Sequence, residues 1–112
     1  CLPMHTFGFP VHLNELIAVC SKWNIPLVED AAESLGSIYY DRPTGSFGQL
    51  GVYSFNGNKI VTSGGGGAIV SNDNTLVVKQ NTLRPLPKCL MPTNTYMMKL
   101  ATIIECQILM QH

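Results

Sequence analysis

Lys59 is the residue of this sequence whose surroundings most favour chemistry. It lies among small, uncharged neighbours in residues 56–60, shortly before four consecutive glycines, residues 64–67. Burial disfavours the ammonium form of a lysine, so an amine in such a place can act as a nucleophile and form a Schiff base with a carbonyl compound. The alternative is an ordinary surface lysine. The position after a strand end and before the glycine run favours the chemical role without deciding it.

Two carboxylates follow the apolar run of residues 25–28, namely Glu29 and Asp30. A carboxylate at the end of a buried strand can hold a cationic ring nitrogen, as the acidic partner of the pyridinium does in pyridoxal phosphate (PLP) enzymes. Asp30 could equally cap a short helix that begins at Ala31, and both interpretations stay open. Glu33 lies about one helical turn after Asp30 and could reach the same pocket.

A second apolar run, residues 51–55, contains Ser54 and ends in Asn-Gly-Asn. A hydroxyl and exposed backbone N–H groups at strand ends suit a phosphate. The glycine run has neither GxGxxG nor Walker spacing, so a nucleotide loop fits poorly, and a flexible hairpin with positive φ is the alternative. Open parallel sheets bind ligands at the carboxyl ends of their strands, which predicts one site containing Asp30, Ser54 and Lys59.

Composition excludes several classes of function. The chain has 112 residues, so it can form one small domain or part of a larger one. Charged residues make up 12%, against about 25% in a typical domain, which predicts surface that is covered by more chain or by another subunit. Net charge is zero without a basic cluster, which argues against nucleic acid. No apolar run approaches the roughly 18 residues of a membrane span.

Histidine and cysteine spacing predicts neither a metal site nor a disulfide framework. His5 and His12 have no ligand spacing with the cysteines. His5 could line the cleft after the first strand, and the preferred interpretation is a loop histidine. The four cysteines form no CxxC pair, which favours free thiols in a reducing compartment over disulfides and hence a cytoplasmic location.

Apolar periodicity predicts the elements that position these residues. Leu13, Leu16, Ile17 and Cys20 have the spacing of one helix face, and that helix ends before Pro26. With a strand end at residues 1–4 and a buried strand at 25–28, this predicts a βαβ unit. Further expectations are helical turns at 31–35, strands at 52–55, 60–62 and 68–71, a helix from about 75 into the low eighties, a proline-marked linker from 85 to 92 and a helix at 97–110.

Four ordered motifs resemble one enzyme family. They are PMHTFGFP at residues 3–10, VEDAAE at 28–33, GSFG at 45–48 and SFNGNK at 54–59. Together they resemble the DegT/DnrJ/EryC1/StrS aminotransferases, PLP-dependent nucleotide-sugar aminotransferases of fold type I. The resemblance covers about residues 1–74. VEDAAESLGS with SFNGNKI looks most like the enzymes that aminate the 4-keto position of UDP-linked 4-keto-6-deoxy-N-acetyl sugars.

The resemblance implies a fold and a role for each site residue. The fold class is α/β, a three-layer αβα arrangement with a mostly parallel sheet that forms part of the large domain. Lys59 would be the catalytic residue that binds PLP covalently and moves the proton, Asp30 would pair with the pyridinium nitrogen, and Ser54 would bind the phosphate. Glu33 falls where the family often has Gln or His near the 3′ oxygen, and a carboxylate suits a phenolate there less well.

The implied reaction transfers an amino group from glutamate to a nucleotide-linked 4-keto-6-deoxy sugar, in a homodimer. Residues 1–84 would be a partial PLP-binding large domain, and residues 85–112 a weakly matched linker and C-terminal helix. The upstream phosphate-binding and ring-stacking segments and the small domain would be absent, which predicts little or no activity for this chain alone. A non-catalytic remnant is the alternative. A family dehydratase is disfavoured because such enzymes replace the lysine that Lys59 represents.

Overall fold

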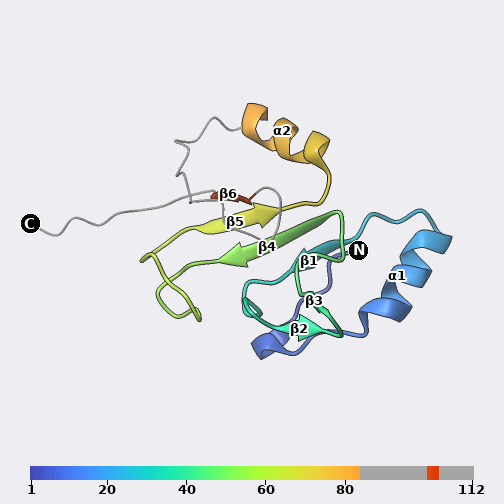
Figure 1. Ribbon diagram of the computed structural model, residues 1–112, viewed down its shortest axis with the longest axis horizontal. Helices are drawn as coiled ribbons and strands as arrows, with labels where there is room; N and C mark the ends of the chain where they lie inside the picture. The colour runs from blue at the N-terminus through green and yellow to red at the C-terminus, as the bar shows by residue number, and fades with distance from the viewer. Residues whose placement is uncertain (84–100, 104–112) are drawn as a thin grey trace, which may run out of the picture.

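The computed structural model describes residues 1–83 and 101–103 (Figure 1). No helix in this part of the chain is long and apolar enough to cross a membrane. The elements, in chain order, are η1 (Thr6–Gly8), α1 (Leu13–Lys22), β1 (Val28–Asp30), β2 (Ile38–Tyr39), β3 (Arg42–Pro43), β4 (Leu50–Ser54), β5 (Gly67–Val70), α2 (Asn74–Leu83) and β6 (Ala101–Ile103).

A four-stranded sheet with the order β1-β4-β5-β6 forms the centre of the structure (Figure 1). β1 pairs with β4 in parallel, whereas β4 with β5 and β5 with β6 pair antiparallel. β2 and β3 form a separate antiparallel hairpin. The predicted α/β class is confirmed. Within the described residues the sheet is mixed rather than mostly parallel, because the chain turns back directly from β4 into β5 without a crossover helix.

The N-terminal segment pairs with β1 in parallel, as a βαβ unit requires. Met4 forms a parallel bridge with Asp30. The N–H of Val28 donates to the carbonyl oxygen of Cys1 (2.9 Å), and the N–H of Asp30 donates to that of Pro3 (2.8 Å). α1 connects the two segments and buries Leu13 and Cys20 from its predicted apolar face. The predicted βαβ order is therefore confirmed.

β1 begins three residues later than the apolar run predicts. The N–H of Ile25 donates to the carbonyl oxygen of Cys20 (2.8 Å), so Ile25 still closes the end of α1. Pro26 has no N–H to contribute to a ladder. The strand therefore starts at Val28 and includes both carboxylates, and Asp30 is its last residue.

Three other predicted elements differ from the structure. Residues 31–36 form turns instead of helix, with Ser34 donating to the carbonyl oxygen of Ala31. The predicted strand at 60–62 is wrong, because these residues belong to the loop between β4 and β5. The predicted helix at 97–110 is wrong at residues 101–103, which form β6; its other residues and the 85–92 linker lie outside the described residues. β5 and α2 confirm the strand predicted at 68–71 and the helix predicted from about residue 75.

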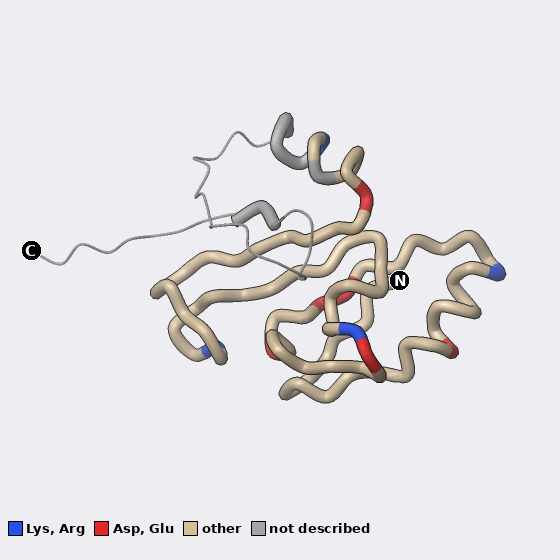
Figure 2. Tube along the Cα trace, viewed as in Figure 1, with Lys and Arg blue, Asp and Glu red and all other residues tan. Residues whose placement is uncertain are grey.

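Small and aromatic residues form the apolar core of the sheet. Ala31, Tyr53, Ala68 and Val70 are buried together, and Leu35 and Phe55 pack against them. Charged positions are sparse along the described trace (Figure 2). The largest fully buried side chains nevertheless include polar ones: His5, Glu29, Thr44 and Ser34. Because buried polar groups require partners, these four indicate an internal hydrogen-bond network.

Candidate active site

Asp30 and Ser54 lie at the same edge of the sheet. Asp30 ends β1 and Ser54 ends β4. The strands run in parallel with Asp30 opposite Val52, so Ser54 is two residues further along the neighbouring strand. The N–H of Ala31 donates to the carbonyl oxygen of Val52 (2.9 Å) and joins the two strand ends. The structure thus places both predicted residues at the edge where parallel strands bind ligands.

Lys59 lies on the loop that leaves this edge and returns as β5. The loop folds back on Phe55, whose carbonyl oxygen accepts from Ser63 N–H (3.0 Å) and from Thr62 Oγ1 (3.1 Å). The N–H of Lys59 donates to the carbonyl oxygen of Asn56 (3.0 Å). Bonds within the loop therefore fix the backbone that carries the amine.

The side chain of Lys59 turns towards Glu33 and forms an ion pair with it. Nζ lies 3.5 Å from Oε1, and the two side chains are 17% and 34% exposed. The other oxygen, Oε2, accepts the N–H of Phe7 (3.0 Å). The Phe7 hydrogen bond, with a smaller contribution from Lys59, lowers the pKa of Glu33 below its ordinary value. Lys59 is therefore a largely covered amine against the turn that follows Asp30, which favours the chemical interpretation over the ordinary surface lysine.

Asp30 and Ser54 each keep one polar function available. Asp30 Oδ1 accepts the N–H of Ala32 (3.1 Å), whereas Oδ2 takes no hydrogen bond within the described part of the chain. Ser54 Oγ accepts the N–H of Asn56 (3.4 Å), and its own proton has no acceptor among residues 1–83 and 101–103. Asp30 thus caps a turn with one oxygen, and the other oxygen is free to accept a proton donor.

A buried carboxylate to which the sequence analysis gave no role, Glu29, joins the end of β1 to the loop of residues 44–48. Glu29 is fully buried. Its Oε1 accepts the N–H groups of Phe47 and Gly48 (both 2.6 Å), and its Oε2 accepts that of Gly45 (2.7 Å). The GSFG motif is therefore a set of backbone donors for Glu29. A carboxylate inside an apolar strand, with a glycine-containing turn downstream, was the signal that could have identified this pairing.

His5 completes the hydrogen-bond partners of Glu29. It lies outside the helices and strands, as the loop interpretation predicts, but it is fully buried. Its Nε2 lies 3.0 Å from Glu29 Oε2. Its Nδ1 accepts the N–H of Val11 (3.3 Å). Because Nδ1 is an acceptor, we assign the proton to Nε2, which donates it to Glu29. His5 thereby ties the N-terminal segment to β1 and to the loop of residues 44–48.

Tyr53 extends the same network from β4. Its hydroxyl donates to the carbonyl oxygen of Thr44. Thr44 in turn donates from Oγ1 to the backbone oxygen of Ser34 (2.9 Å). Burial, followed by the nearby charge of Glu29, raises the pKa of Tyr53 to about 12. The turn after Asp30, the 44–48 loop and β4 are thus held by one buried polar network.

The sequence profile of the DegT/DnrJ/EryC1/StrS aminotransferase family matches residues 1–106. The chain belongs to this family.

Relatives and solved structures agree with this membership. GDP-perosamine synthase of Caulobacter vibrioides is 39% identical over 83 residues, which are 74% of this chain and 22% of the synthase. DesI, solved in the presence of its TDP-sugar product, superimposes with a TM-score of 0.71 at 34% identity over 73% of this chain and 21% of DesI. Spr1654 of Streptococcus pneumoniae in its PLP-form has a TM-score of 0.62 at 25% identity over 72% of this chain and 24% of Spr1654. The chain spans about a fifth of the length of the curated relatives it matches.

The polar functions at the sheet edge fit PLP. Asp30 Oδ2 is an available acceptor for a protonated ring nitrogen, and Ser54 has an available proton for a phosphate oxygen. The Nζ of Lys59 lies against Glu33, in the turn that follows Asp30. Glu33 is the residue that fits least, because its two oxygens are already engaged by Lys59 and by the backbone of Phe7.

Proposed function

We propose that this chain supplies the catalytic lysine and part of the PLP site of a nucleotide-sugar aminotransferase. The proposed reaction moves the amino group of glutamate to a nucleotide-linked 4-keto-6-deoxy sugar. The observation that carries the proposal is the covered amine of Lys59, held at the sheet edge where Asp30 and Ser54 end neighbouring parallel strands. The sugar nucleotides in the names of the GDP-perosamine synthase and of the DesI structure support the substrate class.

Each residue has one task in this proposal. PLP, when bound, supplies an electron sink for the substrate carbon. Lys59 would hold the cofactor through Nζ and would serve as the base that moves a proton to and from the substrate. Asp30 Oδ2 would hold the proton on the ring nitrogen, and Ser54 Oγ–H would donate to the phosphate. Glu29 takes no part in the chemistry but fixes the end of β1 from which Asp30 projects.

Borohydride reduction tests the role of Lys59. The chain is incubated with excess PLP, reduced, digested and mapped by mass spectrometry. We expect the reduced adduct on Lys59 in preference to the exposed Lys22, and we expect it to be lost from this position in a Lys59→Arg variant. An adduct spread equally over the surface lysines, or found elsewhere, would overturn the assignment.

Spectroscopy separates the proposal from the alternative of a non-catalytic remnant. Addition of PLP should produce a new absorption band that requires Lys59, and it should raise the unfolding temperature of the chain, because a ligand that binds the folded state stabilises it. Neither change would be observed for a remnant that kept the fold and lost cofactor binding.

Glutamate as the donor, the homodimer and the cytoplasmic location stay predictions. So does the division into residues 1–84 and 85–112. The donor is tested by the half-reaction with glutamate, measured as release of 2-oxoglutarate, with aspartate and glutamine as comparison donors. The assembly state is tested by sedimentation.

A further inference from the structure

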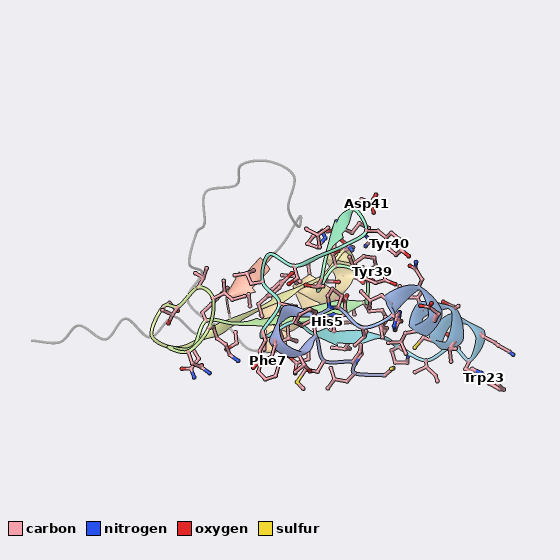
Figure 3. The ribbon with its side chains drawn as sticks, turned by 90° about the horizontal axis from the view of Figure 1, so that it is seen from below. His5, Phe7, Trp23, Tyr39, Tyr40 and Asp41 are labelled. Atoms are coloured by element: carbon pink, nitrogen blue, oxygen red, sulfur yellow. The ribbon has the colours of Figure 1, made fainter. Side chains whose placement is uncertain are left out.

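The turn η1 holds a bulky residue in a conformation that such residues rarely adopt. Phe7 has φ of 52° and is followed by Gly8 with φ of 85°. A non-glycine residue with positive φ is uncommon, and a phenylalanine there requires outside support. The Phe7 residue is also 82% exposed, so burial of its ring does not supply that support. Figure 3 shows Phe7 beside His5, on the lower side of the molecule in that view.

Two hydrogen bonds from the turn after β1 supply the support. Ser37 Oγ donates to the carbonyl oxygen of Gly8 (2.7 Å). Glu33 Oε2 accepts the N–H of Phe7 (3.0 Å). The bond to Glu33 is charge-assisted, because the pKa of this carboxyl is lowered and the group is ionised near neutral pH. Glu33 is therefore a principal restraint on Phe7.

The same carboxylate reaches the amine of Lys59 with its other oxygen, Oε1, at 3.5 Å. Glu33 thus bridges two segments, the backbone of η1 and the β4–β5 loop. A carboxylate held at both oxygens has fewer accessible rotamers than one held at a single oxygen. Removal of either partner therefore loosens the other contact.

We propose that Glu33 is a positioning residue that couples the state of the Lys59 amine to the conformation of the Thr6–Gly8 turn. With the amine free, Glu33 is held at both ends and η1 is fixed with Phe7 exposed. When the amine is engaged elsewhere, Glu33 keeps only the Phe7 contact and the turn becomes more mobile. The coupling itself needs only these residues, whereas its use during turnover rests on the proposed function.

The proposal is tested on the cofactor-free chain by amide hydrogen exchange at Phe7. In a Lys59→Met variant, which keeps the length and removes the charge, we expect exchange at Phe7 to rise about two- to fivefold, the range that a partly exposed ion pair supports. Glu33→Ala should raise it further, because it removes the acceptor itself. Amides of the β4–β5 ladder should exchange at unchanged rates, which shows that the fold is retained.

A second measurement follows the coupling through the reactivity of the Lys59 amine. Reductive methylation of Lys59, relative to Lys22, should accelerate in Glu33→Gln, because the amide retains an acceptor for Phe7 but no longer pairs with the ammonium. Glu15→Gln, on the exposed face of α1, is the matched control and should change neither readout. Unchanged Phe7 exchange in Lys59→Met would overturn the coupling, even if Glu33→Ala raises the exchange by removing the acceptor. Because no PLP is used, this result is independent of whether Lys59 proves to bind the cofactor.

Discussion

The hydroxyl of Tyr53 lies in the buried network and donates to Thr44, with the charge of Glu29 nearby. Its pKa is raised from 10.0 to about 12. Because the folded value lies above the unfolded one, the neutral phenol stabilises the fold fully below pH 10, and this contribution is lost as pH rises towards 12. We expect the urea midpoint to fall over this interval in the native chain and less steeply in Tyr53→Phe. Equal slopes would show that Tyr53 titrates in the fold as it does in the unfolded chain.

The pKa of the Glu33 carboxyl is shifted in the opposite direction to that of Tyr53. Its pKa is lowered from 4.5, first by the Phe7 hydrogen bond. The stabilisation that the ionised carboxylate contributes is therefore complete above about pH 4.5 and is lost as pH falls through the lower, folded pKa. We expect the NMR shift of the Phe7 amide to titrate with a midpoint below 4.5, and that titration to vanish in Glu33→Gln. A midpoint at or above 4.5 would contradict the hydrogen bond to Phe7.

At the scale of elements, Glu29 joins β1 to the loop of residues 44–48. It accepts three backbone N–H groups of that loop and a hydrogen bond from His5 Nε2. Glu29→Gln places an NH₂ group against these donors, and a buried polar group without its partner is costly. We expect a loss of about 3 kcal/mol in the free energy of unfolding, measured by urea titration. The exposed Glu15→Gln is the control and should change stability by no more than about 0.5 kcal/mol.

β4 packs closely against the loop of residues 44–48 at Gly51. A Cβ at Gly51 would overlap the carbonyl oxygen of Gly45, whereas a Cβ at Gly57 meets nothing within 4 Å. Gly51→Ala should therefore cost about 3 kcal/mol of unfolding free energy, because backbone rather than a flexible side chain must move. Gly57→Ala is the matched control in the β4–β5 loop and should be nearly neutral. Similar losses in both variants would contradict the described packing.

Local pattern predicted α1 and β5 well, because their buried faces follow helix and strand periodicity. The same reasoning failed at residues 60–62, where Ile60 and Val61 have strand-forming side chains but are 66% and 54% exposed. Without an apolar partner surface, their propensity does not produce a strand. β6 was missed for the complementary reason, since it exists by pairing with β5, a contact that lies far away in sequence.

Some features of the candidate site follow from local sequence, and others depend on contacts between residues far apart in the sequence. Asp30, Ser54 and Lys59 were singled out because strand ends and glycine runs are local signals, and their roles at a cofactor stay predictions. The pairing of Glu33 with Lys59 and Phe7 was not, because each partner lies 26 residues away and is brought in by a loop. The role of Glu29 depends on the backbone of residues 45–48, which side-chain chemistry does not reveal.

At the scale of the whole molecule, the described surface carries few charges and many exposed apolar side chains. Phe7, Phe9, Trp23 and Tyr40 are all exposed, and Figure 3 shows Trp23 and Tyr40 far from each other, on α1 and on the β2–β3 hairpin. The low share of charged residues, 12% against about 25% in a typical domain, is the feature that indicates surface covered by other protein. This agrees with a chain that spans about a fifth of the length of its relatives.

The proposed cofactor site is formed by the described residues on one side only, and this affects the activity expected of the chain. In the proposed function the described residues would hold the cofactor along one sheet edge, through Asp30, Ser54 and Lys59, and Glu33 beside Lys59 is one-third exposed. Catalysis needs reacting groups held within about 0.5 Å of their productive positions, and water excluded from the site. We therefore expect the 112-residue chain to form an adduct at Lys59 and yet release no 2-oxoglutarate from glutamate above the background of Lys59→Arg. Repeated turnover, with more than one 2-oxoglutarate formed per chain, would show that one sheet edge suffices to orient both cofactor and substrate.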